Sequence, residues 1–182
     1  MKILTTKIQS VIIIEPAVFE DHRGFFMESY NGKMFQELGI ENIFIQDNHS
    51  LSVETGVLRG LHYQLNPQAQ TKLVRVTAGA IYDVVVDIRQ KSPTFGQWVG
   101  VILSAANKRQ LLVPQGFAHG FCTLVPNTEV LYKVDGYYSP EHDRGIAWND
   151  PALAIDWPTT TPILSHKDTK YPVLADAETN FE

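Results

Sequence analysis

Short apolar runs separated by turn residues dominate the chain, and helical periodicity is rare. The runs are rich in Val, Ile, Tyr and Phe and are bounded by Gly, Pro, Asn or Ser, which is typical of β-strands. We expect strands at Ser10–Ile14, Phe25–Tyr30, Asn42–Gln46, Lys72–Thr77, Ile81–Arg89, Gln97–Leu103, Gln110–Val113, Phe117–Leu124 and Glu129–Val134. Many short strands at this spacing predict a mainly β fold, either a sandwich or a barrel, which leaves few exposed edges.

One helix is predicted between the early strands. Asn31 can cap its N-terminus, and Gly39 can end it. Between them, Met34, Phe35 and Leu38 recur at helical spacing and fall on one face. We therefore expect a short amphipathic helix beside the β-structure.

From about residue 151 the chain changes character, because Pro and Thr residues replace the alternating strand pattern. We expect this C-terminal segment to wrap the barrel as irregular structure, and its acidic end, Ala175–Glu182, to fray. No repeat or low-complexity linker divides the chain. Residues 1–182 are therefore predicted to form a single domain.

The composition is that of an ordinary globular protein of 182 residues, with 44% hydrophobic and 19% charged residues. A formal net charge of -5 argues against a general nucleic-acid binder, which usually has a net basic field. The single cysteine, Cys122, can form neither an internal disulfide nor a thiolate metal site, and it favours a reducing compartment. No apolar signal segment or membrane-spanning run is found. We therefore expect a soluble, cytoplasmic protein with no nucleic-acid or membrane partner.

Four polar side chains interrupt otherwise apolar strand faces: His62, Lys72, His119 and Tyr132. Each alternates at period two with neighbours that are predicted to face the interior. A lone histidine or tyrosine on such a face is usually a satisfied core residue, and a lysine at the start of a strand can reach solvent. Four such groups on inward positions of separate strands instead indicate a wet pocket.

Two aspartates also fall within the predicted strand Ile81–Arg89. Asp83 and Asp87 occupy alternate positions, so they share one face. The solvated face of an amphipathic strand explains both residues, and we favour this interpretation for Asp87.

Two histidine motifs resemble the two halves of the cupin signature, which marks a double-stranded jelly roll. They are G-x5-H ending at His62 and P-x-G-x2-H ending at His119. Metal-binding cupins have a second histidine two residues after the first, where this chain has Gln64. Zinc and iron enzymes generally need three suitable protein ligands. We therefore expect a jelly roll without a catalytic metal.

A longer set of motifs is far more specific than any single one. They are F-x-D-x-R-G-F-F from Phe19, Q-D-N-H-S from Gln46, G-V-L-R-G-L-H-Y-Q from Gly56, V-P-x-G-F-A-H-G-F from Val113, K-x3-Y-Y from Lys133 and I-x-W-N-D-P from Ile146. Over nearly the whole chain, this set resembles the dTDP-4-dehydrorhamnose 3,5-epimerases. The resemblance implies a homodimeric jelly roll without metal or other cofactor, and a dTDP-sugar substrate on the way to L-rhamnose.

The expected reaction assigns roles to four residues, which match the family's assignments at these motif positions. A 4-keto group acidifies the hydrogens on C3 and C5, and epimerisation removes a proton from one ring face and returns one to the other. His62 is the natural base, because imidazole titrates near physiological pH, and Asp168 would orient it. Tyr132 is the acid on the far face, and Lys72 would stabilise the enolate oxygen.

The role of Asp168 has a competing interpretation. Ser165 and Asp168 have the spacing of a helix capping box, in which the serine hydroxyl binds the backbone at the aspartate. The sequence alone favours this structural role over a catalytic pair. The family resemblance, which places an aspartate against the base histidine, favours the pair.

Binding of an anionic sugar nucleotide requires local positive charge. Arg23 and Arg59 can each hold diphosphate oxygens through a planar guanidinium, although Arg23 also fits an ordinary turn. The resemblance implies further substrate contacts from Glu28, Gln46, Asn48, His119, Asp143 and Lys167. His119 would hydrogen-bond the sugar or polarise its carbonyl. Asp143 occupies a position where this family is expected to have glutamate.

Three other functions compete with a double epimerase. A related enzyme can epimerise one carbon only or isomerise the same keto sugar. A metal-dependent cupin oxygenase is disfavoured by Gln64. A non-enzymatic binding module leaves the grouping of His62, Lys72 and Tyr132 unexplained.

Overall fold

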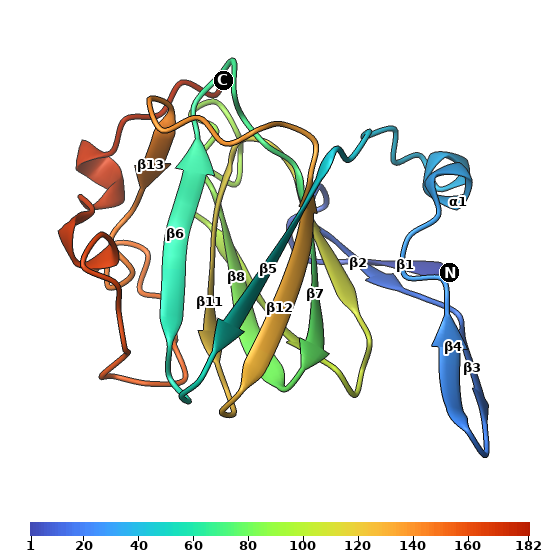
Figure 1. Ribbon diagram of the computed structural model, residues 1–182. Coiled ribbons are helices and arrows are strands. Elements are labelled where there is room, and N and C mark those ends of the chain that lie inside the picture. Colours follow the sequence, from blue (N-terminus) through green and yellow to red (C-terminus); the bar gives the residue numbers. More distant parts are fainter.

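The computed structural model describes residues 1–182 and contains two antiparallel sheets that face each other (Figure 1). The six-stranded sheet has the spatial order β1 (Lys2–Thr5), β2 (Ile12–Glu15), β10 (Gln110–Val113), β7 (Lys72–Ala78), β12 (Thr128–Val134) and β5 (Gln46–Ser52). The five-stranded sheet has the order β13 (Asp143–Gly145), β6 (Leu58–Gln64), β11 (Phe117–Thr123), β8 (Ala80–Asp87) and β9 (Trp98–Ser104). The predicted mainly β jelly roll is confirmed.

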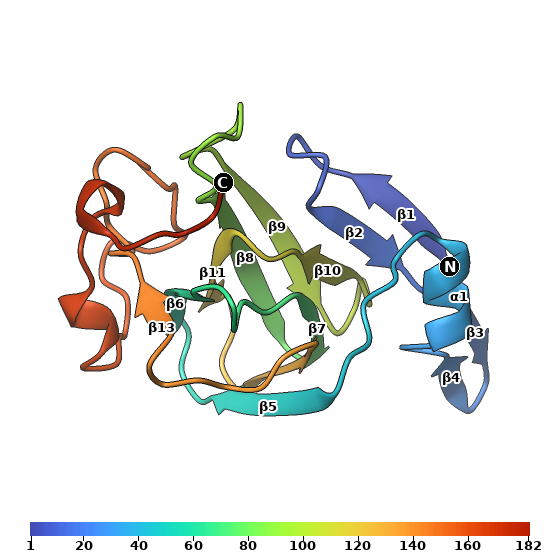
Figure 2. The ribbon, with the colours of Figure 1, turned by 90° about the horizontal axis from the view of Figure 1, so that it is seen from above.

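The remaining elements are short. A hairpin of β3 (Val18–Asp21) and β4 (Gly24–Met27) projects away from both sheets (Figures 1 and 2). Helix α1 (Gly32–Glu37) forms where it was expected, and the Asn31 side chain accepts a hydrogen bond from the backbone N–H of Met34. Two 3-10 helices, η1 (Asp168–Lys170) and η2 (Leu174–Asp176), lie in the C-terminal segment. None of these helices has the length and hydrophobicity needed to span a membrane.

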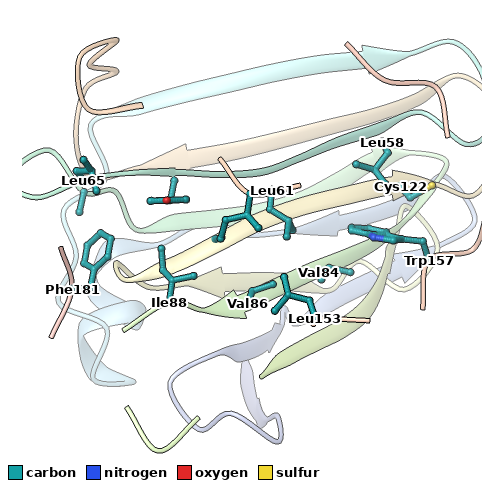
Figure 3. Packing of buried hydrophobic residues seen from close by; sticks show 14 residues of the cluster. Leu58, Leu61, Leu65, Val84, Val86, Ile88, Cys122, Leu153, Trp157 and Phe181 are labelled. Atoms are coloured by element: carbon teal, nitrogen blue, oxygen red, sulfur yellow. The ribbon is translucent and has the colours of Figure 1, made fainter. Parts of the chain in front are cut away.

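Apolar side chains fill both faces of the five-stranded sheet. One buried cluster, which includes Val74, Val85 and Phe121, joins this sheet to the six-stranded sheet. The other face packs against the C-terminal segment through a second cluster, which includes Leu61 and Trp157 (Figure 3). Because alternate strand residues point to opposite faces, a sheet covered on both sides carries long apolar runs. This explains why β8 and β11 were recognisable from sequence.

The acidic C-terminus is anchored rather than frayed, contrary to expectation. Phe181 is only 6% exposed and packs in the second apolar cluster. The Tyr63 hydroxyl donates a 2.7 Å hydrogen bond to the Glu178 carbonyl, and the backbone N–H of Gln90 donates to the Phe181 carbonyl at 3.0 Å. One buried aromatic ring and these backbone contacts outweigh the acidic character of the tail.

Some predicted strand boundaries were wrong. Asn42–Gln46 is largely irregular, and β5 instead spans Gln46–Ser52. This strand was missed because its less exposed face carries Gln46, Asn48 and Ser50, so it lacks an apolar alternation. The short strands β1, β3 and β13 were also missed, since four residues or fewer give little periodic signal.

Asp87 is fully buried, so its predicted place on a solvated strand face is wrong. Its carboxylate accepts hydrogen bonds from Arg89 Nε at 2.9 Å, Ser92 Oγ at 2.6 Å and Thr94 Oγ1 at 2.6 Å. Burial alone would raise the pKa of Asp87, but these hydrogen bonds lower it to about 2. The chain following β8 therefore supplies the donors that make burial of this charge tolerable.

Candidate active site

A cavity of about 410 Å³ contains seven of the predicted site residues. They are Arg59, His62, Lys72, His119, Tyr132, Lys167 and Asp168. A second cavity of about 380 Å³ shares four of them and adds Gln46, Asn48 and Asp143. The structure therefore brings ten of the predicted residues together, from both sheets and from the C-terminal segment.

His62 on β6 and Asp168 on η1 form a close pair. His62 Nε2 lies 2.5 Å from Asp168 Oδ1, and the Asp168 side chain is only 3% exposed. Burial would raise the pKa of Asp168, but hydrogen bonds from His62, Ser165 and the Gly60 backbone hold it below its usual value. The carboxylate is thus ionised and accepts the proton on Nε2, which leaves the lone pair of a neutral ring on Nδ1.

Asp168 makes both predicted contacts, although Ser165 is not a helix N-cap, because the 3-10 helix η1 begins only at Asp168, with Lys167 before it. Ser165 Oγ donates to Asp168 Oδ2 at 2.8 Å, and the Asp168 backbone N–H donates to Ser165 Oγ at 3.1 Å. The same carboxylate binds His62 through its other oxygen. The local turn therefore fixes the carboxylate in the orientation that the histidine requires.

Lys72 starts β7 and points into the cavity rather than to solvent. Its Nζ lies 3.4 Å from the His62 carbonyl oxygen. Burial lowers the pKa of Lys72 to about 8, while the nearby carboxylates of Asp83 and Asp143 oppose the shift. At neutral pH the side chain is therefore mainly a cation inside the cavity, where a developing negative charge would be stabilised.

Tyr132 reaches the cavity from the opposite sheet, on β12. It lies between Val74 on β7 and Asn48 on β5 in the strand register. Burial raises the pKa of Tyr132, and the positive charge of Arg59 opposes this shift. The phenol is thus protonated at neutral pH and has a cation nearby that favours loss of its proton.

His119 has a buried partner that sequence reasoning missed as a site residue. Its Nε2 lies 2.9 and 3.0 Å from the two carboxylate oxygens of Asp83, and Asp83 is fully buried. His119 stands opposite His62 in the β11–β6 register, so two histidine–aspartate pairs flank one cavity. The alternation of Asp83 with Ile81 and Val85, two apolar residues, was the signal that it faces inward.

Polar contacts organise the second cavity. Gln46 Nε2 donates to Asn48 Oδ1 at 2.9 Å along β5. Asp143 pairs with Lys167 and accepts a 3.0 Å hydrogen bond from the Tyr138 hydroxyl. Burial alone would lower the pKa of Lys167, but the hydrogen bond to Asp143 raises it, so this cation persists at neutral pH. The cavity thus offers amide groups, a carboxylate and a cation to a polar ligand.

Three predicted binding residues lie at the rim or beyond it. Arg59 borders the cavity and its Nη2 donates to the Leu51 carbonyl at 3.3 Å. Arg23 is on the projecting hairpin, highly exposed, and pairs with Asp21 at 2.7 Å. Glu28, just after that hairpin, accepts from Asn31 Nδ2 at 3.2 Å. The structure does not bring Arg23 or Glu28 to the cavity of the same chain.

Gln64, at the position of the expected second metal ligand, is committed to the backbone. Its Nε2 donates to the Gln68 carbonyl at 2.6 Å, and its Oε1 accepts from the Ser139 backbone N–H at 2.8 Å. No group of three or more His, Cys, Asp or Glu side chains has the arrangement of a metal site. The residue therefore supports the loop before β13 and offers no free donor atom to a metal at His62.

The fold and the cavity together define an acid–base enzyme built on an antiparallel jelly roll. The dTDP-4-dehydrorhamnose 3,5-epimerase family matches residues 5–176, and the chain belongs to this family. An enzyme of that name from Pseudomonas aeruginosa is 56% identical over 180 residues, which cover 98% of each chain.

Solved structures agree with this assignment. That of dTDP-4-dehydrorhamnose 3,5-epimerase from Bacillus anthracis, with TDP and PPi bound, superimposes with a TM-score of 0.93 at 60% identity. The superposition covers 94% of this chain and 98% of the Bacillus anthracis chain. The dTDP-6-deoxy-D-glucose-3,5-epimerase from Legionella pneumophila, in complex with dTDP-4-keto-L-rhamnose, superimposes with a TM-score of 0.92 at 53% identity. This superposition covers 96% of this chain and 93% of the Legionella chain. The similarity thus spans both the sheets and the cavity.

Proposed function

We propose that the protein converts dTDP-4-dehydro-6-deoxy-D-glucose to dTDP-4-dehydro-L-rhamnose by epimerisation at C3 and C5, in dTDP-L-rhamnose biosynthesis. The observation that carries this proposal is the His62–Asp168 pair, which shares one cavity with Lys72 and Tyr132. Family membership supports the same reaction. A cytoplasmic location belongs to this proposal, since the lone Cys122 is free and buried.

Proton abstraction starts the proposed mechanism. The 4-keto group makes the hydrogens on C3 and C5 acidic, and His62 Nδ1 removes one of them from one face of the ring. Asp168 stabilises the imidazolium that forms, as in other histidine–aspartate pairs. The charge that develops on the keto oxygen is stabilised by the Lys72 ammonium.

Reprotonation on the other face completes each inversion. Tyr132 comes from the opposite sheet and donates its phenolic proton to the carbanion carbon. The Arg59 cation favours the phenolate that remains, until the proton from His62 is exchanged back through solvent. These two proton-transfer steps require no redox cofactor, because the substrate is neither oxidised nor reduced overall.

The nucleotide contacts are proposed from position and chemistry. Arg59 at the rim binds the diphosphate, and His119 donates a hydrogen bond to the sugar. The remaining cavity contacts to the nucleotide come from Gln46, Asn48, Asp143 and Lys167. Asp143 already binds Lys167 and Tyr138, so an aspartate, although one methylene shorter than the glutamate expected in this family, is compatible with a preformed site.

A homodimer would place Arg23 and Glu28 in a site. The hairpin that carries Arg23 exposes three aromatic side chains, Phe19, Phe25 and Phe26, by 66%, 57% and 67%. Apolar patches of this kind on a soluble domain indicate a protein contact. We propose that this hairpin packs against a second copy of the chain and brings Arg23 and Glu28 to that copy's cavity.

Mixed dimers test this arrangement. Inactive His62→Ala and Arg23→Ala proteins are unfolded, mixed and refolded together. If the hairpin acts across the interface, about a quarter of the wild-type sites are restored, because half of the dimers are mixed and each contains one intact site. No restoration despite mixed dimers, or a strict monomer by solution mass, contradicts the proposal.

Proton NMR in deuterated water tests the reaction itself. The protein is incubated with dTDP-4-keto-6-deoxyglucose without added metal, and a reductase traps the product. Deuterium at C3 and C5 with L-rhamno product supports the double epimerase, and His62→Ala should abolish both signals. Exchange at one carbon indicates a single-site enzyme, and binding without exchange indicates a binding module. Activity that appears only with added metal contradicts the cofactor-independent mechanism.

A further inference from the structure

The ring of His62 needs more support than its single carboxylate contact provides. The hydrogen bond to Asp168 fixes Nε2, but the His62 side chain remains 33% exposed toward the cavity. With the ring attached covalently at Cγ and hydrogen-bonded at Nε2, the motion that remains is rotation about the axis through these two atoms, which changes where Nδ1 points. Since proton abstraction depends on where Nδ1 points, a second contact must limit this motion.

Tyr171 supplies such a contact. Its ring centroid lies 5.6 Å from that of His62, and the planes meet at 68° in an edge-to-face arrangement. Tyr171 directly follows η1, three residues after Asp168. Because side chains three residues apart align in a 3-10 helix, one turn directs both Asp168 and Tyr171 toward His62.

The strand beside His62 is shaped to admit the Tyr171 ring. Gly145 on β13 is paired with His62 on β6, and a Cβ atom at Gly145 would lie 2.5 Å from the Tyr171 ring. The ring therefore lies directly against the glycine backbone. Two residues after the end of β13, the Ala147 backbone N–H donates a 2.7 Å hydrogen bond to the Pro172 carbonyl, which fixes the chain just after Tyr171.

The Tyr171 hydroxyl is buried and makes no well-formed hydrogen bond, although burial raises its pKa and the nearby Lys167 ammonium opposes that shift. A buried hydroxyl without a well-formed hydrogen bond is costly, so it explains little of why the ring is there. Tyr171 does not itself line either cavity of the site, but it lies behind His62, which lines both. What remains is the flat, rigid face and edge of the aromatic ring.

We propose that Tyr171, seated on Gly145, is a positioning residue that holds the His62 ring so that Nδ1 points at the substrate carbon. This inference rests on the proposed function, in which His62 is the base. Asp168 sets which nitrogen carries the proton, and Tyr171 sets the direction of the other nitrogen. The two residues therefore act on the same ring through different contacts.

Kinetics of three variants test the proposal. Tyr171→Met keeps a flexible apolar side chain, of smaller volume, but loses the rigid ring, and we expect kcat to fall 10- to 100-fold with KM within about 3-fold. Tyr171→Phe keeps the ring, so it should retain kcat within about 2-fold. Gly145→Ala displaces the ring from behind and should reproduce the kcat loss of Tyr171→Met. The double variant Gly145→Ala/Tyr171→Met should have a kcat only slightly below that of either single variant, because both substitutions remove the same contact.

A matched control separates positioning from general destabilisation. Tyr82 also makes an edge-to-face contact, with its centroid 6.2 Å from that of Trp157, but it lies outside the cavity. Tyr82→Met should lower the melting temperature without changing kcat. A kcat of Tyr171→Met within about 3-fold of wild type, or a Tyr171→Phe loss as large as that of Tyr171→Met, would overturn the proposal.

Carbon-13 relaxation dispersion of the histidine ring carbons gives a readout of ring motion that does not depend on turnover. His62→Asn identifies the His62 signals, and wild type should show a single ring orientation without exchange. Tyr171→Met should show exchange between ring orientations, and Tyr171→Phe should not. Exchange of the same size already in wild type overturns the positioning role even if a variant fails to fold. Absence of sugar exchange in wild type, by contrast, counts against the proposed function alone.

Discussion

His62 and Asp168 lie 106 residues apart in sequence, yet His62 Nε2 and Asp168 Oδ1 are separated by only 2.5 Å. The contact joins β6, next to the edge strand β13 of the five-stranded sheet, to the C-terminal segment. Backbone hydrogen bonds from Leu58 N–H to the Ile163 carbonyl, at 3.0 Å, and from Ile163 N–H to Gly56, at 2.9 Å, fasten that segment beside β6. The His62–Asp168 pair therefore depends on the packing of a segment without strands.

Asp168→Asn should lower kcat by about 10³-fold while leaving the fold intact, because an amide neither stabilises the imidazolium nor selects the tautomer. Ser165→Ala removes only the hydrogen bond that orients the carboxylate and should cost about 3- to 10-fold. Initial rates of deuterium exchange measure both effects. A Ser165→Ala loss as large as that of Asp168→Asn would show that the capping interaction, and not the charge, dominates.

Tyr132→Phe should impair product formation more than initial proton removal. The phenol is needed to return a proton on the far face, whereas abstraction by His62 does not involve it. Substrate exchange and product formation are followed in the same NMR sample. Equal and complete loss of both signals in a folded variant contradicts the assignment of Tyr132 as the acid.

The value of kcat/KM should fall as the pH rises through about 8, because Lys72 loses its proton there in the free enzyme. Burial disfavours the ammonium form, so the charged state that stabilises the enolate is present below this pKa and is lost above it. Lys72→Arg stays charged and should lack this decline, at a lower kcat because of its different shape. Lys72→Met should lose at least about 100-fold at every pH.

An alkaline decline near pH 8 that persists unchanged in Lys72→Arg would assign the titration to another group. The matched measurement is kcat for the bound complex, where the negative charge of the substrate should raise the pKa of Lys72 and move the decline to higher pH. Both profiles are obtained from the same set of initial rates.

Period-two alternation was sufficient to place His62, Lys72, His119 and Tyr132 in one cavity. It failed for β5, where the less exposed face carries polar residues, because hydrophobicity then does not distinguish the inner face of the strand from the outer one. The pairing of His62 with Asp168 could not be derived from spacing, because a local capping pattern explained Asp168 equally well. Only the family resemblance indicated this long-range contact, and the structure shows that both hydrogen bonds coexist.

Burial of Asp87 was likewise not predictable from alternation alone. The charge is tolerated because Arg89, Ser92 and Thr94 follow within seven residues and turn back onto it. Such a local donor set is visible in the sequence only once the turn after β8 is known. Without knowledge of that turn, the charge of Asp87 predicts a solvated strand face.

Asp87→Asn should lower the free energy of unfolding at pH 7 by about 2 kcal/mol without changing kcat, because it leaves Arg89 beside a neutral amide and lies outside the cavity. The pKa of Asp87 is about 2 in the folded protein, below the ordinary value of 3.8. Its ionised form therefore stabilises the fold above pH 4, and this stabilisation, about 2 kcal/mol, is lost as the pH falls toward 2. Urea unfolding of both proteins at several pH values measures the difference. Wild type and Asp87→Asn should converge in stability at pH 2, and parallel profiles down to that pH would contradict the assigned pKa.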